Sequence, residues 1–143
     1  MDNSKYIKLM WLPSIEECLF SLEDESNFNE PRIKNIIKSS LDLQTWHNNF
    51  TVLYKNWLND NSEEIYNINS AINLEIIRKI TSLNQHLKEV KIFYWFDIDR
   101  SKSCNEDYLW QHCPLSNLPL IELKSVHPNN KYISSKHPLV FPE

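Results

Sequence analysis

The chain has 143 residues, of which 41% are hydrophobic and 24% charged, and its formal net charge is −4. This length and composition predict a single globular domain over residues 1–143 and argue against disorder. The acidic balance disfavours direct nucleic-acid binding, which needs a basic surface, and no apolar run approaches the ~20 residues of a membrane span.

The N-terminal region is predicted to form a strand and then a helix. Residues 5–12 are apolar at nearly every position, which indicates a mostly buried strand that Pro13 ends. A capping box from Ser14 to Glu17 then predicts the start of a helix. Four apolar side chains would share the inner face of this helix: Ile15, Cys18, Leu19 and Leu22.

Further helices are predicted between residues 29 and 87. One begins at Pro31, which a first helical turn tolerates, and ends near Leu41. The next begins at residues 42–45 and has the clearest helical stripe in the chain. The last stretch begins at Ser62, and a break at residues 69–73 would divide it into two helices. We expect four aromatic side chains of the central stripe to be core: Trp46, Phe50, Tyr54 and Trp57.

The C-terminal third is predicted to be mostly β-structure. Residues 90–98 are β-branched and aromatic, which favours a central strand covered on both faces. Residues 99–117 are expected to form a loop or a short helix. Further strands are expected at residues 118–126, at an edge formed by Tyr132 and Ile133, and in a tail that docks through residues 139–141.

This order of elements predicts an α+β fold. We expect an N-terminal strand, four to five helices, and then a small, mostly antiparallel sheet of two to three strands with the helices on one face. The chain contains no glycine, although average usage would give about ten. Glycine-dependent phosphate loops and nucleophile elbows are therefore excluded.

Asparagine is expected to replace glycine in the turns. The chain has seventeen asparagines and seven prolines, and asparagine is the best non-glycine residue in the left-handed region. We expect Asn48-Asn49, Asn129-Asn130 and the run at residues 59–61 to serve this role. The abundance of Ile, Lys and Asn also hints at an AT-rich bacterial gene.

The cysteines and the first residues predict a reducing compartment. The three cysteines, Cys18, Cys104 and Cys113, are an odd number, and residues 1–4 lack the basic start of a secretory signal. We therefore expect a cytoplasmic protein.

Two groups of residues could suggest metal chemistry. Asp97 and Asp99 project to the same side at the end of the predicted central strand, which would suit Mg²⁺ or acid–base work, but they also simply end a strand. Five further residues have side chains that bind zinc, without the close pairs of a zinc knuckle: Cys104, His112, Cys113, His127 and His137. The adjacent Cys113 and His112 make a poor catalytic pair. We expect no metal, no cofactor and no catalysis.

Acidic residues beside aromatic ones favour a protein-binding surface. Such a surface offers anchors together with electrostatic complementarity to a basic partner. The predicted contact residues are Glu23, Asp24, Glu25, Asp97, Asp99, Glu106, Asp107, Tyr108 and Trp110.

A small acidic domain without a catalytic motif resembles, in type, the immunity proteins and antitoxins of bacterial toxin systems. The resemblance implies a protein that binds and neutralises a basic toxin domain, such as a nuclease, by occluding its active site. Two alternatives stay open: a Mg²⁺- or Zn²⁺-dependent enzyme that uses Asp97 and Asp99, and a structural protein of a mobile element.

Overall fold

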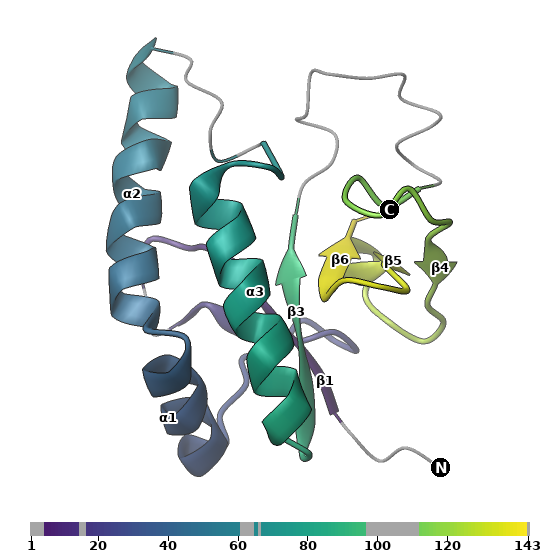
Figure 1. Cartoon of the computed structure of the whole chain (residues 1–143). Helices are drawn as coiled ribbons and strands as arrows, with labels where there is room; N and C mark the ends of the chain where they lie inside the picture. Colours follow the sequence, from purple (N-terminus) through teal and green to yellow (C-terminus); the bar gives the residue numbers. More distant parts are fainter. Residues whose placement is uncertain (1–4, 15–16, 61–64, 66, 97–111, 143) are drawn as a thin grey trace.

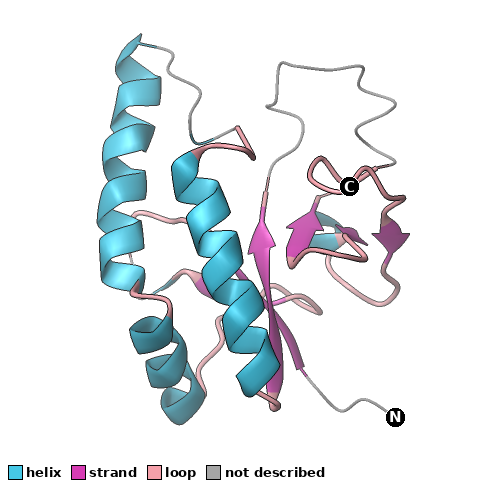
Figure 2. Ribbon diagram, in the orientation of Figure 1, coloured by secondary structure: helices cyan, strands magenta, loops and turns pink. Residues whose placement is uncertain are grey.

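The computed structural model describes residues 5–14, 17–60, 65, 67–96 and 112–142. These residues form an α+β fold in which three α-helices lie on one face of a six-stranded mixed sheet (Figures 1 and 2). The elements in chain order are β1 (Lys5–Leu9), β2 (Leu19–Ser21), α1 (Pro31–Ser40), α2 (Leu43–Asp60), α3 (Ala71–His86), β3 (Val90–Trp95), β4 (Ile121–Glu122), the 3₁₀ helix η4 (Pro128–Asn130), β5 (Tyr132–Ile133) and β6 (Leu139–Phe141).

The sheet has the strand order β2-β1-β3-β6-β5-β4, and its centre is parallel. β1 pairs with β3 in parallel from Lys5↔Val90 to Leu9↔Tyr94, and β3 pairs in parallel with β6. The predicted sheet of two to three strands was too small, because the sheet has six strands. Three of its five pairings are antiparallel, and the prediction missed the two parallel pairings at the centre. A helical crossover separates β1 from β3, and such a connection permits parallel pairing where a tight hairpin would not.

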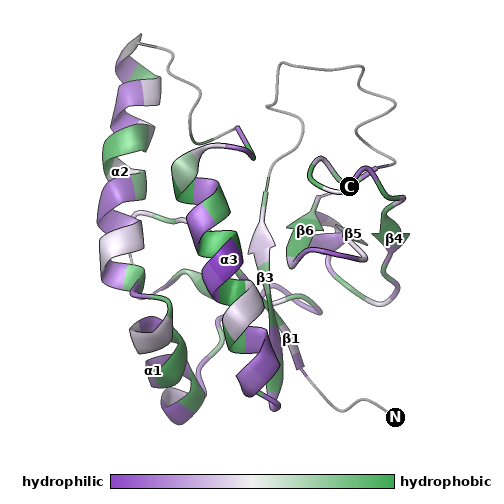
Figure 3. Ribbon diagram, viewed as in Figure 1, coloured by the Kyte–Doolittle hydropathy of each residue, from purple (hydrophilic) through white to green (hydrophobic). Residues whose placement is uncertain are grey.

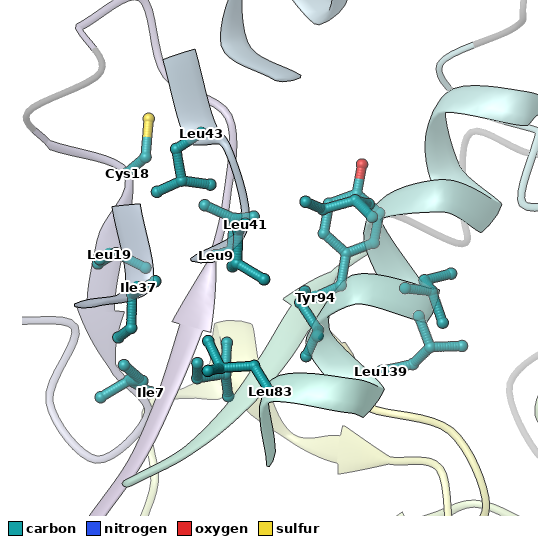
Figure 4. Close-up of a cluster of buried hydrophobic side chains, with 14 of the residues drawn as sticks. Ile7, Leu9, Cys18, Leu19, Ile37, Leu41, Leu43, Leu83, Tyr94 and Leu139 are labelled. Carbon is teal, nitrogen blue, oxygen red and sulfur yellow. The ribbon is translucent and has the colours of Figure 1, made fainter. Parts of the chain in front are cut away.

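The main hydrophobic core lies between the sheet and the helices. Ile7 and Leu9 of β1 point into it beside Tyr94 of β3 and Leu139 of β6, and Ile37 of α1 packs there as well (Figure 4). Successive side chains of a strand point to opposite faces of the sheet, so Lys8 of β1 and Phe93 of β3 lie on the face away from the helices. A smaller apolar cluster covers that face: Leu22, Phe93, Ile133 and Val140.

The predicted helix after Ser14 is wrong. Residues 19–21 form β2, which pairs antiparallel with β1 through Ile7↔Ser21 and Leu9↔Leu19. Every residue from Cys18 to Leu22 is buried. A short run of buried residues is compatible with a strand as well as with a helix. The backbone hydrogen-bonding groups of β1 are available for pairing, and they favour the strand.

The two helices predicted from Pro31 and from residues 42–45 are confirmed as α1 and α2. The Glu30 carboxylate accepts hydrogen bonds from the Arg32 and Ile33 amides and so caps α1. The described residues hold three α-helices rather than four to five. The predicted start at Ser62 lies outside them, and α3 begins only at Ala71 because residues 67–70 form a turn.

The C-terminal strands differ from expectation in length and place. Of the predicted strand at residues 118–126, only Ile121 and Glu122 pair as β4. Tyr132 and Ile133 form β5 as predicted, but β5 lies between β4 and β6 rather than at an edge. The tail at residues 139–141 is a full member of the sheet, as β6.

The left-handed positions are mostly not occupied by asparagine. Among the described residues, positive φ occurs at Glu25, Asp42, Asn117 and Ser125. The pair Asn48-Asn49 lies inside α2, contrary to the turn prediction. Within α2, Asn48 Oδ1 accepts a hydrogen bond from the Gln44 side-chain amide one turn earlier, a contact that supports the helix.

Asparagine instead completes backbone hydrogen bonding. The Asn84 side chain in α3 accepts from the Ile92 amide and donates to the Ile92 carbonyl, both at 2.9 Å. Within β3, only Tyr94 and Trp95 pair with β6, so Ile92 has no strand partner on that side. Asn84 supplies the hydrogen bonds that a longer β6 would provide.

A buried lysine lies on the face of the sheet opposite the helices. The Lys8 side chain is fully buried and forms an ion pair with Glu25. Its Nζ also donates to Asn130 Oδ1 at 2.7 Å and lies 5.5 Å from the centre of the Trp95 ring. The Asn130 amide donates in turn to Glu25 and to the Leu22 carbonyl. This cluster therefore joins β1, the turn after β2 and η4.

We expect Glu25→Gln to lower the free energy of unfolding by about 3 kcal/mol, since breaking a buried pair leaves the Lys8 charge uncompensated. Lys8→Met should cost less, because the Glu25 side chain is 20% exposed and can be hydrated. Urea unfolding measures both losses. Glu23→Gln, at an exposed neighbouring acid, is the control, and an equal loss for both glutamines would contradict the burial argument.

The ion pair of Lys8 and Glu25 should make the free energy of unfolding depend on pH. Burial raises the pKa of Glu25, but the hydrogen bond and charge of Lys8 outweigh burial and hold this pKa below its ordinary value of 4.5. The stability that the Glu25 carboxylate contributes is thus present above pH 4.5 and is lost as the pH falls through the folded pKa.

The free energy of unfolding should consequently fall more steeply below pH 4.5 for the wild type than for Glu25→Gln. Hydrogen bonds from Ser26 also lower the pKa of Asp24, but Asp24 is present in both proteins and its contribution cancels. Urea unfolding at a series of pH values tests this expectation, and parallel curves would refute it.

Candidate functional site

The parallel pairing of β1 and β3 brings their carboxyl ends to one edge of the sheet. Met10 and Trp11 follow β1 there, and Phe96 follows β3. In Figure 1, α2 extends along this side past the start of α3 and beyond the end of β3. Ligands of open α/β sheets commonly bind at the carboxyl ends of parallel strands. This edge is accordingly the first place to look for a site.

Four half-buried aromatic residues form a continuous surface at this edge, which we call the aromatic ledge: Trp11, Phe50, Tyr54 and Trp57. The Trp11 ring stacks on Phe50 with centroids 5.5 Å apart and lies 4.7 Å from Tyr54. Tyr54 contacts Trp57 at 5.7 Å. Phe50 still packs against the core, whereas Tyr54 and Trp57 lie farther along α2 towards its end.

The ledge revises the prediction that the aromatic stripe is core. Trp46 is buried, at 5% exposure, as expected. Phe50, Tyr54 and Trp57 are only half-buried. The helical period correctly places these side chains on one face of α2, but α2 is longer than the layer it packs on, so the end of that face is not fully covered.

A small pocket of about 110 Å³ lies next to the ledge. Its lining residues come from the ends of β1 and β3, from α2 and from the turn before α3: Met10, Trp11, Phe50, Tyr54, Ile65, Tyr94, Trp95 and Phe96. Six of these eight are aromatic, and none of their side chains carries a formal charge.

The inner wall of the pocket is held by a buried polar chain. The Tyr94 hydroxyl donates to Asn73 Oδ1 at 2.6 Å, and the Asn73 amide donates to the carbonyls of Ile65 and Asn67. Burial raises the pKa of Tyr94 far above its ordinary value, so the hydroxyl keeps its proton. Asn73 thereby fixes Ile65, a lining residue, to β3.

The outer surface of α2 is unusually poor in charge. Lys55 and Asp60 are its only formally charged residues among eighteen. Leu58 is 58% exposed and Val52 57% exposed. In Figure 3, hydrophobic residues recur along α2 beyond the start of α3. The other exposed side chains of α2 are polar but mostly uncharged, chiefly asparagine. Depletion of charged residues is a feature of interface centres.

The acidic and aromatic residues predicted in the 97–111 segment lie outside the described residues: Asp97, Asp99, Glu106, Asp107, Tyr108 and Trp110. Along the chain, however, Asp97 directly follows the pocket residue Phe96. Glu23 and Asp24 are exposed after β2. The third residue predicted there, Glu25, pairs with the buried Lys8, a structural contact that the sequence analysis did not foresee.

The residues considered for zinc are scattered. Cys113 is buried, and His127 Nδ1 accepts from the Asn129 amide, while Cys104 lies outside the described residues. Burial lowers the pKa of His137, and the neighbouring Lys136 adds to this. Within the described part of the chain, no three His, Cys, Asp or Glu side chains gather as a possible metal site.

Sequence reasoning missed Trp11 and the pocket. Trp11 was assigned to the first strand, although it lies beyond the end of β1 and against α2. The one local signal is Pro13, which limits the strand and could have suggested that Trp11 turns away. No local pattern pairs Trp11 with Tyr54, because their contact depends on the docking of α2.

No protein-family model matches the chain, and no curated protein or solved structure is significantly similar to it. Among the described helices, none combines the length and apolarity that crossing a membrane requires.

We expect Asn73→Leu to lower the free energy of unfolding by about 2–4 kcal/mol, since it leaves the buried Tyr94 hydroxyl and the buried Ile65 carbonyl without their partner. Tyr94→Phe removes one hydroxyl and should cost about 1 kcal/mol. Urea unfolding measures both changes, with the exposed Asn69→Ala as control. A loss of stability for Asn73→Leu no larger than that of the control would show that the hydrogen bonds of Asn73 do not hold the pocket wall.

Proposed function

We propose that this protein is a non-catalytic binding domain that docks on a partner protein through the aromatic ledge and its pocket. The observation that carries the proposal is the ledge itself: four contacting, half-buried aromatic rings, three of them on α2, a helix almost free of charge, and the fourth, Trp11, just after β1. Exposed aromatic clusters with few charges are typical of interface centres, where Trp and Tyr act as anchors.

The charges of the chain favour a basic partner. The chain carries nineteen acidic and fifteen basic residues, a formal net charge of −4. A net negative charge would steer a basic protein towards the chain.

Size, charge and the absence of glycine-dependent catalytic loops support an immunity or antitoxin role in the bacterial cytoplasm. In this role the ledge contacts a basic toxin domain, such as a nuclease, and the bound domain covers the toxin's active site. Inhibition by occlusion needs no catalytic residue in the inhibitor, so it requires only affinity and a suitable position.

The test uses the product of the gene adjacent to the one encoding this chain. We expect that product to be toxic when expressed alone, and coexpression of the wild-type chain to restore growth. Leu58→Asp and Trp57→Ala should weaken the complex at least about 30-fold, the effect of losing one interface hot spot. Isothermal titration calorimetry with the purified proteins measures the affinity.

Val52→Asp is the matched control. Val52 has nearly the same exposure as Leu58 and lies on the same helix, but it is about 160° around the helix axis from Tyr54. Growth rescue and affinity should therefore survive Val52→Asp. Equal weakening by Val52→Asp and Leu58→Asp would exclude the ledge as the interface, and an adjacent product that is neither toxic nor bound would remove the immunity role.

A further inference from the structure

The segment that carries Trp11 lies beyond the strand pairing of the sheet. β1 ends at Leu9, and the Met10 amide makes one more backbone hydrogen bond, to the Cys18 carbonyl at 2.9 Å. Within the described part of the chain, neither Trp11 nor Leu12 joins a hydrogen bond between backbone groups. Other contacts must therefore fix Trp11 at the ledge.

Two side chains of α2 hold this segment, and we call them the α2 clamp: His47 and Thr51. They are one helical turn apart, so they lie on the same side of α2. Trp11 Nε1 donates to Thr51 Oγ1 at 3.1 Å, and His47 Nε2 lies 2.7 Å from the Leu12 carbonyl. Since a carbonyl only accepts, the His47 ring carries a proton on Nε2.

The helix itself orients the clamp. The Thr51 hydroxyl donates to the His47 carbonyl, four residues earlier, at 2.7 Å. Its proton is thus committed to the backbone of α2, and its oxygen is left to accept from the indole of Trp11. The Trp11 ring also stacks on the His47 ring, with centroids 5.9 Å apart. Trp11 is therefore held both at its nitrogen and against its ring.

An anchor that is held before binding favours affinity. Ordering one mobile side chain at an interface weakens binding by about 2- to 12-fold, and a side chain that is already ordered avoids this loss. Trp11 is the ring of the ledge that contacts both Phe50 and Tyr54. A mobile Trp11 would consequently loosen the part of the ledge that lies against the sheet.

We propose that Thr51 and His47 are positioning residues, which hold Trp11 in its binding orientation before a partner arrives. Trp11 contacts the partner, and the α2 clamp acts through Trp11. This inference rests on the proposed function, and it identifies what makes a rigid anchor of an aromatic residue that belongs to no strand.

The first test measures Trp11 in the full chain without a partner. Thr51→Val keeps the approximate shape of the side chain and removes the acceptor. We expect the order parameter of the Trp11 Nε1–H bond, from ¹⁵N relaxation, to fall from about 0.85 to below about 0.6. Thr51→Ser restores a hydroxyl and should restore the rigid value. The Trp11 signal is the indole signal that Trp11→Ala removes.

Two controls accompany this measurement. Trp95 Nε1, which donates to the Asn129 carbonyl at 2.9 Å, should stay rigid in every variant. Thr45→Val makes the same change at an exposed threonine of α2 and should leave Trp11 rigid. An unchanged order parameter in Thr51→Val, or no recovery in Thr51→Ser, would overturn the clamp.

The second test measures affinity for the adjacent gene product by isothermal titration calorimetry. Trp11→Ala should weaken the complex at least about 30-fold, and Thr51→Val by about 2- to 12-fold, with recovery in Thr51→Ser. Thr51 is half-buried, so a double-mutant cycle distinguishes positioning from direct contact. Adding Thr51→Val to Trp11→Ala should cause no further loss, whereas equal losses in both backgrounds would refute positioning.

His47 tests the other half of the clamp. It is 8% exposed, so it has almost no surface with which to contact a partner. His47→Leu removes the donor to the Leu12 carbonyl and should lower both the order of Trp11 and the affinity. The amide introduced by His47→Gln can donate and should preserve more of both. Unchanged order in His47→Leu would reject the role of His47, and the Thr51 variants decide if His47→Leu does not fold.

The two proposals fail separately. A Trp11 that loosens in Thr51→Val, combined with no binding of the adjacent gene product, would keep the clamp and reject the proposed function. A complex that depends on Trp57 and Leu58 but tolerates Trp11→Ala would keep the ledge as an interface and reject the positioning role.

Discussion

The parallel pairing of β1 with β3 is the interaction on which the other features depend. Five consecutive residue pairs, from Lys5↔Val90 to Leu9↔Tyr94, join strands that are far apart in the sequence. Parallel strands cannot be joined by a tight turn, so the chain between them must cross over the sheet. The helices α1, α2 and α3 make this crossover and bury the face that carries Ile7 and Leu9.

The same pairing determines where a site can form. It aligns the ends of β1 and β3, so Trp11 and Phe96 meet at one edge although their strands begin in different parts of the chain. α2 is longer than the sheet layer requires, and its last turns bring Tyr54 and Trp57 to that edge without full cover. The ledge thus follows from a difference in length between a helix and the layer beneath it.

Buried polar groups make the fold specific. Asn73 ties the turn before α3 to β3, Asn84 completes the hydrogen bonding of Ile92, and Asn130 joins Lys8 to Glu25. Each joins different elements of the fold, and an unmatched partner in any of them would be a buried unsatisfied group. Asparagine is therefore important in this glycine-free chain, but more as a partner for buried polar groups than as a substitute for glycine in turns.

Much of the secondary structure could be predicted from local patterns. The apolar period predicted α1 and α2, the β-branched and aromatic run predicted β3 as a central strand, and the order of the predicted elements indicated the α+β class. Residues 18–22 were wrongly predicted to be helical. All five side chains are buried, so the run lacks the periodicity that distinguishes a strand from a helix. The acidic residues predicted to bind a partner at 97–110 lie outside the described residues, so that prediction stands untested.

By itself, the sequence determined which side chains share a helical face, where the central strand lies, and that glycine-dependent phosphate loops are impossible. Only the tertiary structure decided that β1 and β3 are parallel, that Lys8 is buried against Glu25, and that Trp11 meets Tyr54 beside a pocket. The physical reason is the range of the interactions. Periodicity and capping act within a few residues, whereas strand pairing, ion pairing in the interior and the assembly of a pocket depend on residues that only folding brings together.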